Sequence, residues 1–185
     1  MNRRQFLSTT AGIATMTTAT LAGCIGTASA TGTLATRVSD QPGDISDFER
    51  CAVTVDEVFV KPADGERETH AVEERTFDLV ELQGDRSAPL ADLELDAGEY
   101  EYLQLSVVDT EATLADGSNA TVEVPGDAPL KFEEPFEIRE GERTTFTADF
   151  TPVRAGGSGK YVLQPVADEV VVRYESQNAT TTAGE

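Results

Sequence analysis

The 185-residue chain has no tryptophan, one histidine, two cysteines and few basic residues. Its 14 Lys and Arg stand against 34 Asp and Glu, which gives a formal net charge of −20. A nucleic-acid-binding surface is excluded, because affinity for phosphate needs an excess of basic residues. A multi-span membrane protein is also excluded, because no run of about 18 uninterrupted apolar residues exists. The hydrophobic fraction of 39% argues against disorder, which the charge alone would suggest.

Lysine is scarcer than arginine in this chain, since only Lys61, Lys131 and Lys160 accompany 11 arginines. An acid excess with little lysine is typical of proteins that work in near-saturating salt. At roughly 1 M salt the Debye length falls to about 3 Å, so repulsion among carboxylates is screened. In dilute buffer the same charges oppose the compact state. We therefore expect a fold that needs molar salt; an acidic surface that serves only solubility is the alternative.

Residues 1–23 are expected to form an export signal and are set apart from the folded domain. Arg3 and Arg4 form a twin arginine before Phe6 and Leu7, which resembles a twin-arginine signal. The apolar stretch that follows, 11–22, is too short and too rich in threonine to span a bilayer stably. We expect the protein to be exported to the cell surface.

The sequence Leu21-Ala22-Gly23-Cys24 resembles a lipobox, at which a lipoprotein is cleaved before Cys and modified with lipid on it. We expect a lipid on Cys24, with 24–31 as linker, to anchor the protein to the outer face of the cytoplasmic membrane. This cleavage leaves 162 residues and, with Arg3 and Arg4 lost, a net charge of −22. The alternative is cleavage after Ala30, which would release a free secreted protein.

The second thiol, Cys51, opens an apolar run and is expected to behave as a small buried hydrophobe. A lipid on Cys24 would rule out an intramolecular disulfide, and a disulfide between Cys24 and Cys51 is the alternative. The chain has no Cys or His cluster with zinc-site spacing.

The mature chain shows short stretches of period-two alternation separated by turn residues, and no long helical periodicity. Val53 and Val55 share one face, whereas Val58 and Val60 have the opposite parity, so the slip at 56–57 predicts a β-bulge or a strand that crosses between sheets. The pattern predicts one all-β domain over 32–175, an antiparallel β-sandwich, and a polar tail over 176–185.

Further strands and turns are expected along the same domain. Asp116-Gly117 predicts a hairpin, Glu140-Gly141-Glu142 predicts a tight turn, and Pro165 indicates an edge strand or a break. The other expected strands are 76–82, 90–95, 99–108, 144–150, 161–163 and 170–174.

No catalytic residues are expected. Nucleophilic catalysis needs a Ser or Cys beside a base, and the single histidine, His70, lies in a charged stretch typical of a solvated loop or edge strand. The glycine-rich segment 156–159 has neither nucleophile-elbow nor phosphate-loop spacing. With 34 acids, adjacent carboxylates such as Glu73-Glu74 are explained by a solvated acidic face.

The sequence offers few candidates for metal-binding and glycosylation sites. Carboxylate oxygens suit Ca²⁺, and Asp40 and Asp149 are the residues to mutate first, but no segment has EF-hand spacing and no metal or cofactor is expected. Two Asn-x-Thr triplets, at Asn119 and Asn178, are candidate glycosylation sites in an exported chain.

Several motifs occur in a characteristic order along the chain. They are Gly32-Thr-Leu34, Val38-Ser-Asp40-Gln-Pro42, Val53-Thr-Val-Asp-Glu-Val58, Asp78-Leu-Val-Glu-Leu82, Gly98-Glu-Tyr100-x-x-Leu103-x-Leu105, Asp116-Gly117, Asp149-Phe150 and Gly159-Lys-Tyr161-x-Leu163-x-Pro165-Val166. Together these motifs resemble a family of secreted prokaryotic lipoproteins, domain of unknown function 4382, over nearly all of 32–172. The resemblance implies a transthyretin-like or immunoglobulin-like sandwich at a cell surface and supplies no activity. The sequence has Asp149-Phe150-Thr151 where that family typically has Asp-Phe-Asp, and it lacks a tryptophan common in the family.

The sequence favours a lipid-anchored, non-catalytic binding or adhesion module, expected to be a monomer, with a surface polysaccharide or an envelope protein as partner. A structural envelope component without a small ligand and a carboxylate-based hydrolase are the alternatives. An exposed aromatic strip would favour sugar binding, whereas buried aromatics would favour the structural role. The hydrolase would need two acids in a cleft with pKa values pushed apart.

Overall fold

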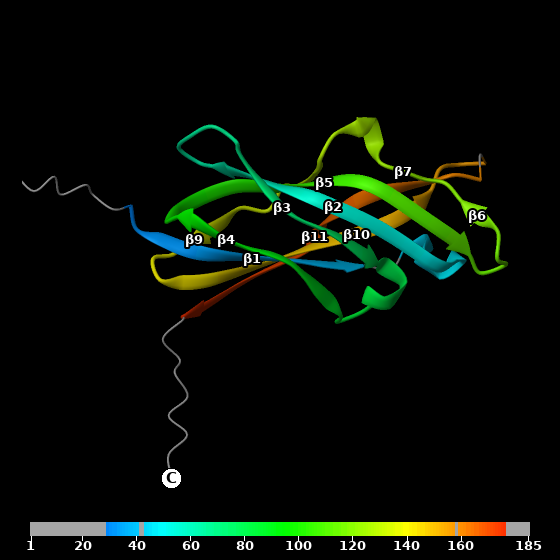
Figure 1. Cartoon of the computed structure of the whole chain (residues 1–185), viewed down its shortest axis with the longest axis horizontal. Helices are drawn as coiled ribbons and strands as arrows, with labels where there is room; N and C mark the ends of the chain where they lie inside the picture. The colour runs from blue at the N-terminus through cyan, green and yellow to red at the C-terminus, as the bar shows by residue number, and fades with distance from the viewer. Residues whose placement is uncertain (1–28, 41–42, 158, 177–185) are drawn as a thin grey trace, which may run out of the picture.

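The computed structural model describes residues 29–40, 43–157 and 159–176 (Figure 1). Strands dominate, and the predicted all-β sandwich is confirmed. Three short 3-10 helices, η1 (Asp44–Asp47), η2 (Leu79–Leu82) and η3 (Pro125–Asp127), lie in its connections. The strands are β1 (Thr31–Asp40), β2 (Phe48–Pro62), β3 (Glu68–Asp78), β4 (Ser87–Asp96), β5 (Gly98–Leu114), β6 (Asn119–Ala120), β7 (Val122–Glu123), β8 (Leu130–Phe132), β9 (Phe136–Ile138), β10 (Glu142–Arg154) and β11 (Tyr161–Ser176).

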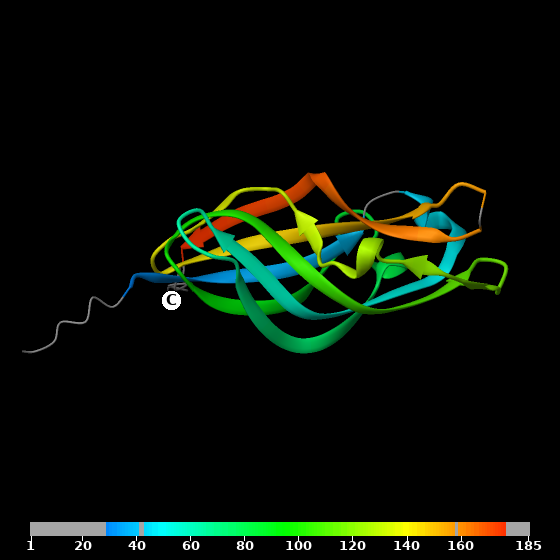
Figure 2. The same cartoon turned by 90° about the horizontal axis from the view of Figure 1, so that it is seen from above.

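Two sheets form the layers of the sandwich, as Figure 2 shows from above. One sheet has the order β4-β1-β10-β11-β7, and the other has the order β3-β2-β5-β6, with β8 and β9 also paired to β5. Most neighbours are antiparallel, but β1 pairs with β10 and β11 pairs with β7 in parallel. The sheet that carries β1 is therefore mixed, a departure from the purely antiparallel expectation.

The alternation seen in the sequence sets the core. On β10, Phe146, Ala148 and Phe150 are buried on one face, as their spacing predicts. Phe132 from the facing sheet contacts both phenylalanines edge-to-face, with ring centroids 6.3 Å and 5.5 Å apart. The predicted bulge is present, because the register of β2 against β3 shifts between Val55 and Glu57. Burial of the inner faces holds the two layers together.

The turns agree with the glycine signals, with one correction. Gly117 has a φ of 81° at the hairpin between β5 and β6, a conformation that favours glycine. The predicted strand 76–82 is wrong beyond residue 78, because 79–82 form the helix η2. The Asp78 carboxylate accepts the N–H groups of Val80 and Cys51, and this capping turns the chain away from the sheet.

The strand β11 is longer than the sequence suggested. Pro165 lies inside it, opposite Phe150, and the register against β10 then shifts between Thr147 and Asp149. Beyond Val162, β11 has no second paired strand among the described residues, so Pro165 occupies an edge, where its missing N–H is tolerated. Nowhere in the described part of the chain is there a helix with the length and apolar character to cross a membrane.

Both ends of the folded domain lie at one end of the sandwich (Figures 1 and 2). Glu142, at the start of β10, pairs with Ser176 at the end of β11, and the Gly141 N–H donates to the Thr31 carbonyl at the start of β1. We call this the terminal end. The turn at Gly117 lies at the opposite, distal end. β1 runs toward this end and finishes at Asp40, opposite Phe150, four residues before β10 ends at Arg154.

Candidate functional site

A groove lies at the terminal end of the sandwich. It consists of two adjoining hollows of about 410 Å³ each, which share Ala63, Glu99 and Tyr100. The first hollow lies between the β2–β3 and β4–β5 turns, and the second lies beside β9 and β11. Four segments far apart in sequence therefore meet here: 62–68, 96–101, 135–137 and Tyr174.

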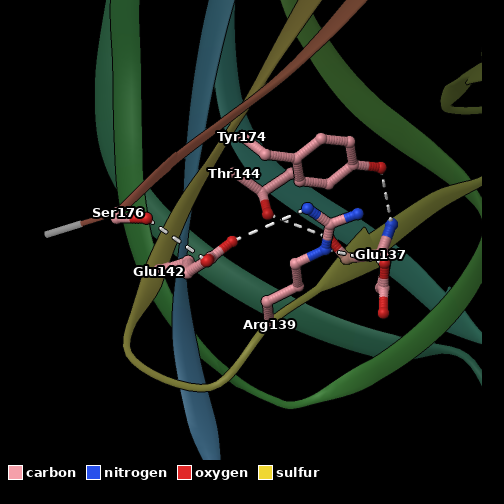
Figure 3. Close-up of polar contacts among 6 residues, drawn as sticks. All are labelled: Glu137, Arg139, Glu142, Thr144, Tyr174 and Ser176. Carbon is pink, nitrogen blue, oxygen red and sulfur yellow. Dashed lines mark hydrogen bonds and ion pairs between the residues drawn. The ribbon is translucent and has the colours of Figure 1, made fainter.

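Tyr174 forms the exposed aromatic wall of the groove, with 39% of its surface accessible. The Arg139 guanidinium lies 4.0 Å from the centre of its ring and pairs with Glu137 at 2.8 Å and Glu142 at 3.7 Å. The Tyr174 hydroxyl accepts the Glu137 N–H at 3.3 Å (Figure 3). The ring is thus held in place at its hydroxyl and by a cation on its face.

Further contacts fix the strands that carry this wall. The Thr144 hydroxyl donates to the Glu137 carbonyl at 2.8 Å, and the Ser176 hydroxyl lies 3.4 Å from the Glu142 carboxylate (Figure 3). These bonds join β9, β10 and β11, so the wall is supported by three strands instead of a loop.

Beneath the groove lies a buried aromatic pair. Tyr100 and Phe136 stack with ring centroids 5.1 Å apart, and Phe136 meets Phe146 of the core edge-to-face. The Tyr100 hydroxyl donates to the Asp96 carbonyl at 3.0 Å. Burial, followed by the charges of Glu68 and Asp96, raises the pKa of Tyr100 to about 12. Tyr100 is therefore neutral at any physiological pH, and its buried ring is an apolar part of the groove lining.

Every ionisable side chain that lines the groove, apart from the tyrosines, is a carboxylate. The groove contains no lysine or arginine among its lining residues. Arg139 and Lys61 pair with two of these carboxylates, Glu137 at 2.8 Å and Glu101 at 3.6 Å, so a ligand that carries phosphate, sulfate or carboxylate groups would still meet an excess of like charge there. The acidic lining residues are Asp64, Glu68, Asp96, Glu99, Glu101 and Glu137.

A separate polar site lies at the distal end, where the two metal candidates come close together. Asp149 pairs with Ser39 on the neighbouring strand, one residue before Asp40. Asp40 is 0% exposed, and neither of its carboxyl oxygens has a hydrogen-bond partner in the described part of the chain. Burial first, and the charge of Asp149 second, raise the pKa of Asp40 to about 8. The described residues include no group of three or more His, Cys, Asp or Glu arranged to hold a metal ion.

Cys51 is buried near this site and has a free thiol, as the sequence predicted. Burial, and then the charges of Asp40 and Asp78, raise the pKa of Cys51 to about 12. Because the thiolate is the reactive form, this thiol is inert.

The other predicted site residues that the structure describes do not line the groove, although His70 contacts the lining residue Glu68. His70 sits on the edge strand β3, with its imidazole 3.3 Å from the Glu68 carboxylate, in agreement with the edge-strand interpretation. Asn119 is exposed on β6, so its sequon stays a prediction with an accessible side chain. Arg3, Arg4, Cys24 and Asn178 lie outside the described residues, and the expectations placed on them stay predictions.

The aromatic side chains do not form an exposed strip. All seven phenylalanines within the described residues are buried, and so are Tyr100 and Tyr161. Tyr102 is half-buried, and the Lys131 ammonium lies 4.2 Å from the centre of its ring. An exposed strip is therefore absent from the described part of the chain, and by that criterion the buried aromatics favour the structural role. Tyr174 alone among the described aromatics is exposed, so any stacking surface is one ring wide.

Comparison with known proteins decides the family. The profile of the family named domain of unknown function DUF4382 matches residues 31–165, which include most of the sandwich. The chain belongs to the DUF4382 family. A search of curated proteins found no match.

Among solved structures, this DUF4382 domain is similar to a Bacteroides eggerthii protein described as a "putative cell adhesion protein". The similarity covers 80% of this chain, at 13% identity and a TM-score of 0.37. The chain spans 56% of the length of that protein.

Sequence reasoning missed the groove of this DUF4382 domain, because its lining comes from four separate segments. Two local signals were available. Tyr174 is an aromatic residue at the end of the final strand, and Arg139 and Glu137 precede the predicted turn at Gly141. Neither signal shows that these segments meet, since that depends on the pairing of β11 with β10.

Proposed function

We propose that this protein is exported, held at the cell surface by a lipid on Cys24, and acts as a non-catalytic binding module adapted to high salt. The proposed export rests on Arg3 and Arg4, and the proposed lipid anchor rests on the lipobox that ends at Cys24. The salt adaptation rests on the net charge of −20 and the small number of lysines. The binding role rests on the groove at the terminal end.

The observation that carries the binding role is the combination of a supported, exposed tyrosine with a rim of carboxylates. Sugars present C–H faces that pack on an aromatic ring and hydroxyl groups that donate to carboxylates. In molar salt, long-range attraction by the acidic rim is screened, so direct contacts must supply the affinity. The groove therefore suits an uncharged glycan better than a polycation, and an acidic glycan is opposed at contact distance, where salt screens the carboxylates less.

The arrangement of the carboxylates favours binding over hydrolysis. A glycosidase of the usual kind needs two carboxyl groups flanking the bond that breaks, one with a raised pKa. The carboxyl group with the strongly raised pKa, that of Asp40, is fully buried at the distal end. It lies away from the groove, whose carboxylates belong to the terminal end.

A panel of matched oligosaccharides tests the binding role. In molar KCl, calorimetry of the full chain with cellotetraose should show binding, and an equally long glucuronate oligomer should show none. Tyr174→Ala should lose at least tenfold in affinity, whereas Tyr174→Phe, which keeps the ring, should lose much less. Equal affinity of wild type and Tyr174→Ala for cellotetraose, or tighter binding of the acidic oligomer, would refute the proposed site.

Cell fractionation tests the anchor on its own. Wild type should partition with membranes. The Cys24→Ser variant should appear in the medium or have a molecular mass without the lipid. A Cys51→Ser variant is the matched control, because it removes the other thiol and should leave partitioning unchanged. If Cys24→Ser stays membrane-bound with an unchanged mass, the lipid anchor is refuted.

A further inference from the structure

The groove and the point of attachment lie at the same end of the molecule. The Ala30 carbonyl accepts the N–H of Ala97 at 2.7 Å, and Ala97 lines the first hollow. Ser176 ends β11 at this end too, two residues after the groove residue Tyr174. The chain that leads back to Cys24 therefore starts from the rim of the groove.

The length of that connection limits the distance between groove and membrane. Ala30 lies six positions after Cys24 in the chain. A fully extended chain spans at most about 3.3–3.6 Å per residue, so a lipid on Cys24 keeps the rim within about 20 Å of the bilayer surface. Strands rise about 3.3 Å per residue, so β10, with 13 residues, would place the distal end roughly 40 Å farther out.

We infer that the ligand of the groove is the uncharged sugar headgroup of a glycolipid in the membrane that holds the Cys24 anchor. This inference rests on the proposed function and adds the source of the sugar. A glycan carried on the bilayer lies within reach of the terminal end, whereas a polymer in the surrounding medium meets the distal loops first. The excess of carboxylates in the groove lining opposes anionic headgroups at contact distance.

The arrangement also has an energetic consequence. Two weak attachments on one molecule act together, because the first raises the effective concentration of the second. A lipid on Cys24 would be the first of these attachments. A headgroup held in the groove would supply a second attachment to the same bilayer and would hold the terminal end against it.

Vesicle flotation of the full-length Cys24→Ser protein in molar KCl tests the inference. Phosphatidylcholine vesicles that contain diglucosyldiacylglycerol should carry more protein than vesicles of phosphatidylcholine alone or with phosphatidylglycerol. The additional Tyr174→Ala change should abolish the difference, and soluble diglucosylglycerol should compete. Equal flotation on all three vesicles, or flotation unaffected by Tyr174→Ala, would overturn the inference.

A second measurement separates this inference from the binding role. If the protein binds cellotetraose in solution through Tyr174 but shows no preference for glycolipid vesicles, the binding role stands and the glycolipid source is wrong. For the lipidated protein, energy transfer to a labelled lipid should be stronger from a dye on Glu140→Cys, at the terminal end, than from one on Asp116→Cys, at the distal end. The reverse order would contradict the orientation.

Discussion

Asp40 and Asp149 lie on adjacent parallel strands, one residue apart in register, because Asp149 pairs with Ser39. Asp40 is fully buried and Asp149 is 3% exposed. Burial away from water disfavours the charged form, and the charge of Asp149 adds to this, so the pKa of Asp40 rises to about 8. At neutral pH this buried carboxyl group is therefore mainly protonated.

The raised pKa of Asp40 predicts that stability falls as pH rises. The unfolded carboxyl releases its proton near pH 4 and the folded one near pH 8, so between these values the unfolded state binds fewer protons. Asp40→Asn should remove this fall and be more stable than wild type at pH 8, by on the order of a few kcal/mol. Denaturant melts from pH 4 to pH 9 in molar KCl measure the difference.

Asp85→Asn is the matched control for this experiment. It makes the same chemical change on an exposed residue in the turn before β4, so its pH profile should follow that of wild type. If Asp40→Asn and wild type lose stability with pH at the same rate, Asp40 is not the group responsible.

Gly32 is expected to tolerate no side chain. A Cβ at this position would lie 2.2 Å from the Arg139 carbonyl oxygen, which belongs to the backbone and cannot move aside easily. Gly32→Ala should destabilise the protein by about 1–3 kcal/mol, the usual range for overpacking. Gly98→Ala, with no atom within 4 Å of its Cβ, should change stability much less. Equal thermal melts for the two variants would contradict this packing.

Tyr161 is expected to contribute through its hydroxyl as well as its ring. The hydroxyl donates to the Asp47 carboxylate at 2.8 Å and lies 3.0 Å from the Arg154 guanidinium, which ties η1 to β10 and β11. Tyr161→Phe should cost about 1 kcal/mol of stability, the typical net value of one such bond. Tyr102→Phe, whose hydroxyl makes no hydrogen bond within the described residues, should be neutral by the same chemical denaturation.

The charge of the chain predicts a stability that depends on salt. Repulsion within a domain of net charge near −20 should fall as KCl rises, since the Debye length shortens from about 10 Å at 0.1 M to about 3 Å at 1 M. The melting temperature should therefore rise steadily between these concentrations. A melting temperature that does not change with KCl would leave solubility as the explanation of the acidity.

Features that depend on residues close together in the sequence could be predicted. The alternation of Phe146, Ala148 and Phe150 gave the buried face of β10, and the parity change after Val55 gave the bulge in β2. The turns at Gly117 and Gly141 followed from residues that adopt positive φ.

Features that depend on distant pairing could not be predicted. Nothing local in β1 indicates a parallel partner more than a hundred residues away, and this pairing is what brings Asp40 beside the strand of Asp149. Asp149 alternates with the phenylalanines, a position that predicts an outward-facing side chain, yet it is buried. For the same reason Tyr174 could be assigned to a strand but not to a groove.

Mapping of the sugar-binding surface tests the central claim most directly. In an NMR titration of the full chain with cellotetraose in molar KCl, amide shifts should concentrate at the groove, at Ala63, Gly98, Glu101, Glu137 and Tyr174. Shifts centred on the distal turns at Gly84 and Gly117, or no shifts at saturating sugar, would contradict the account.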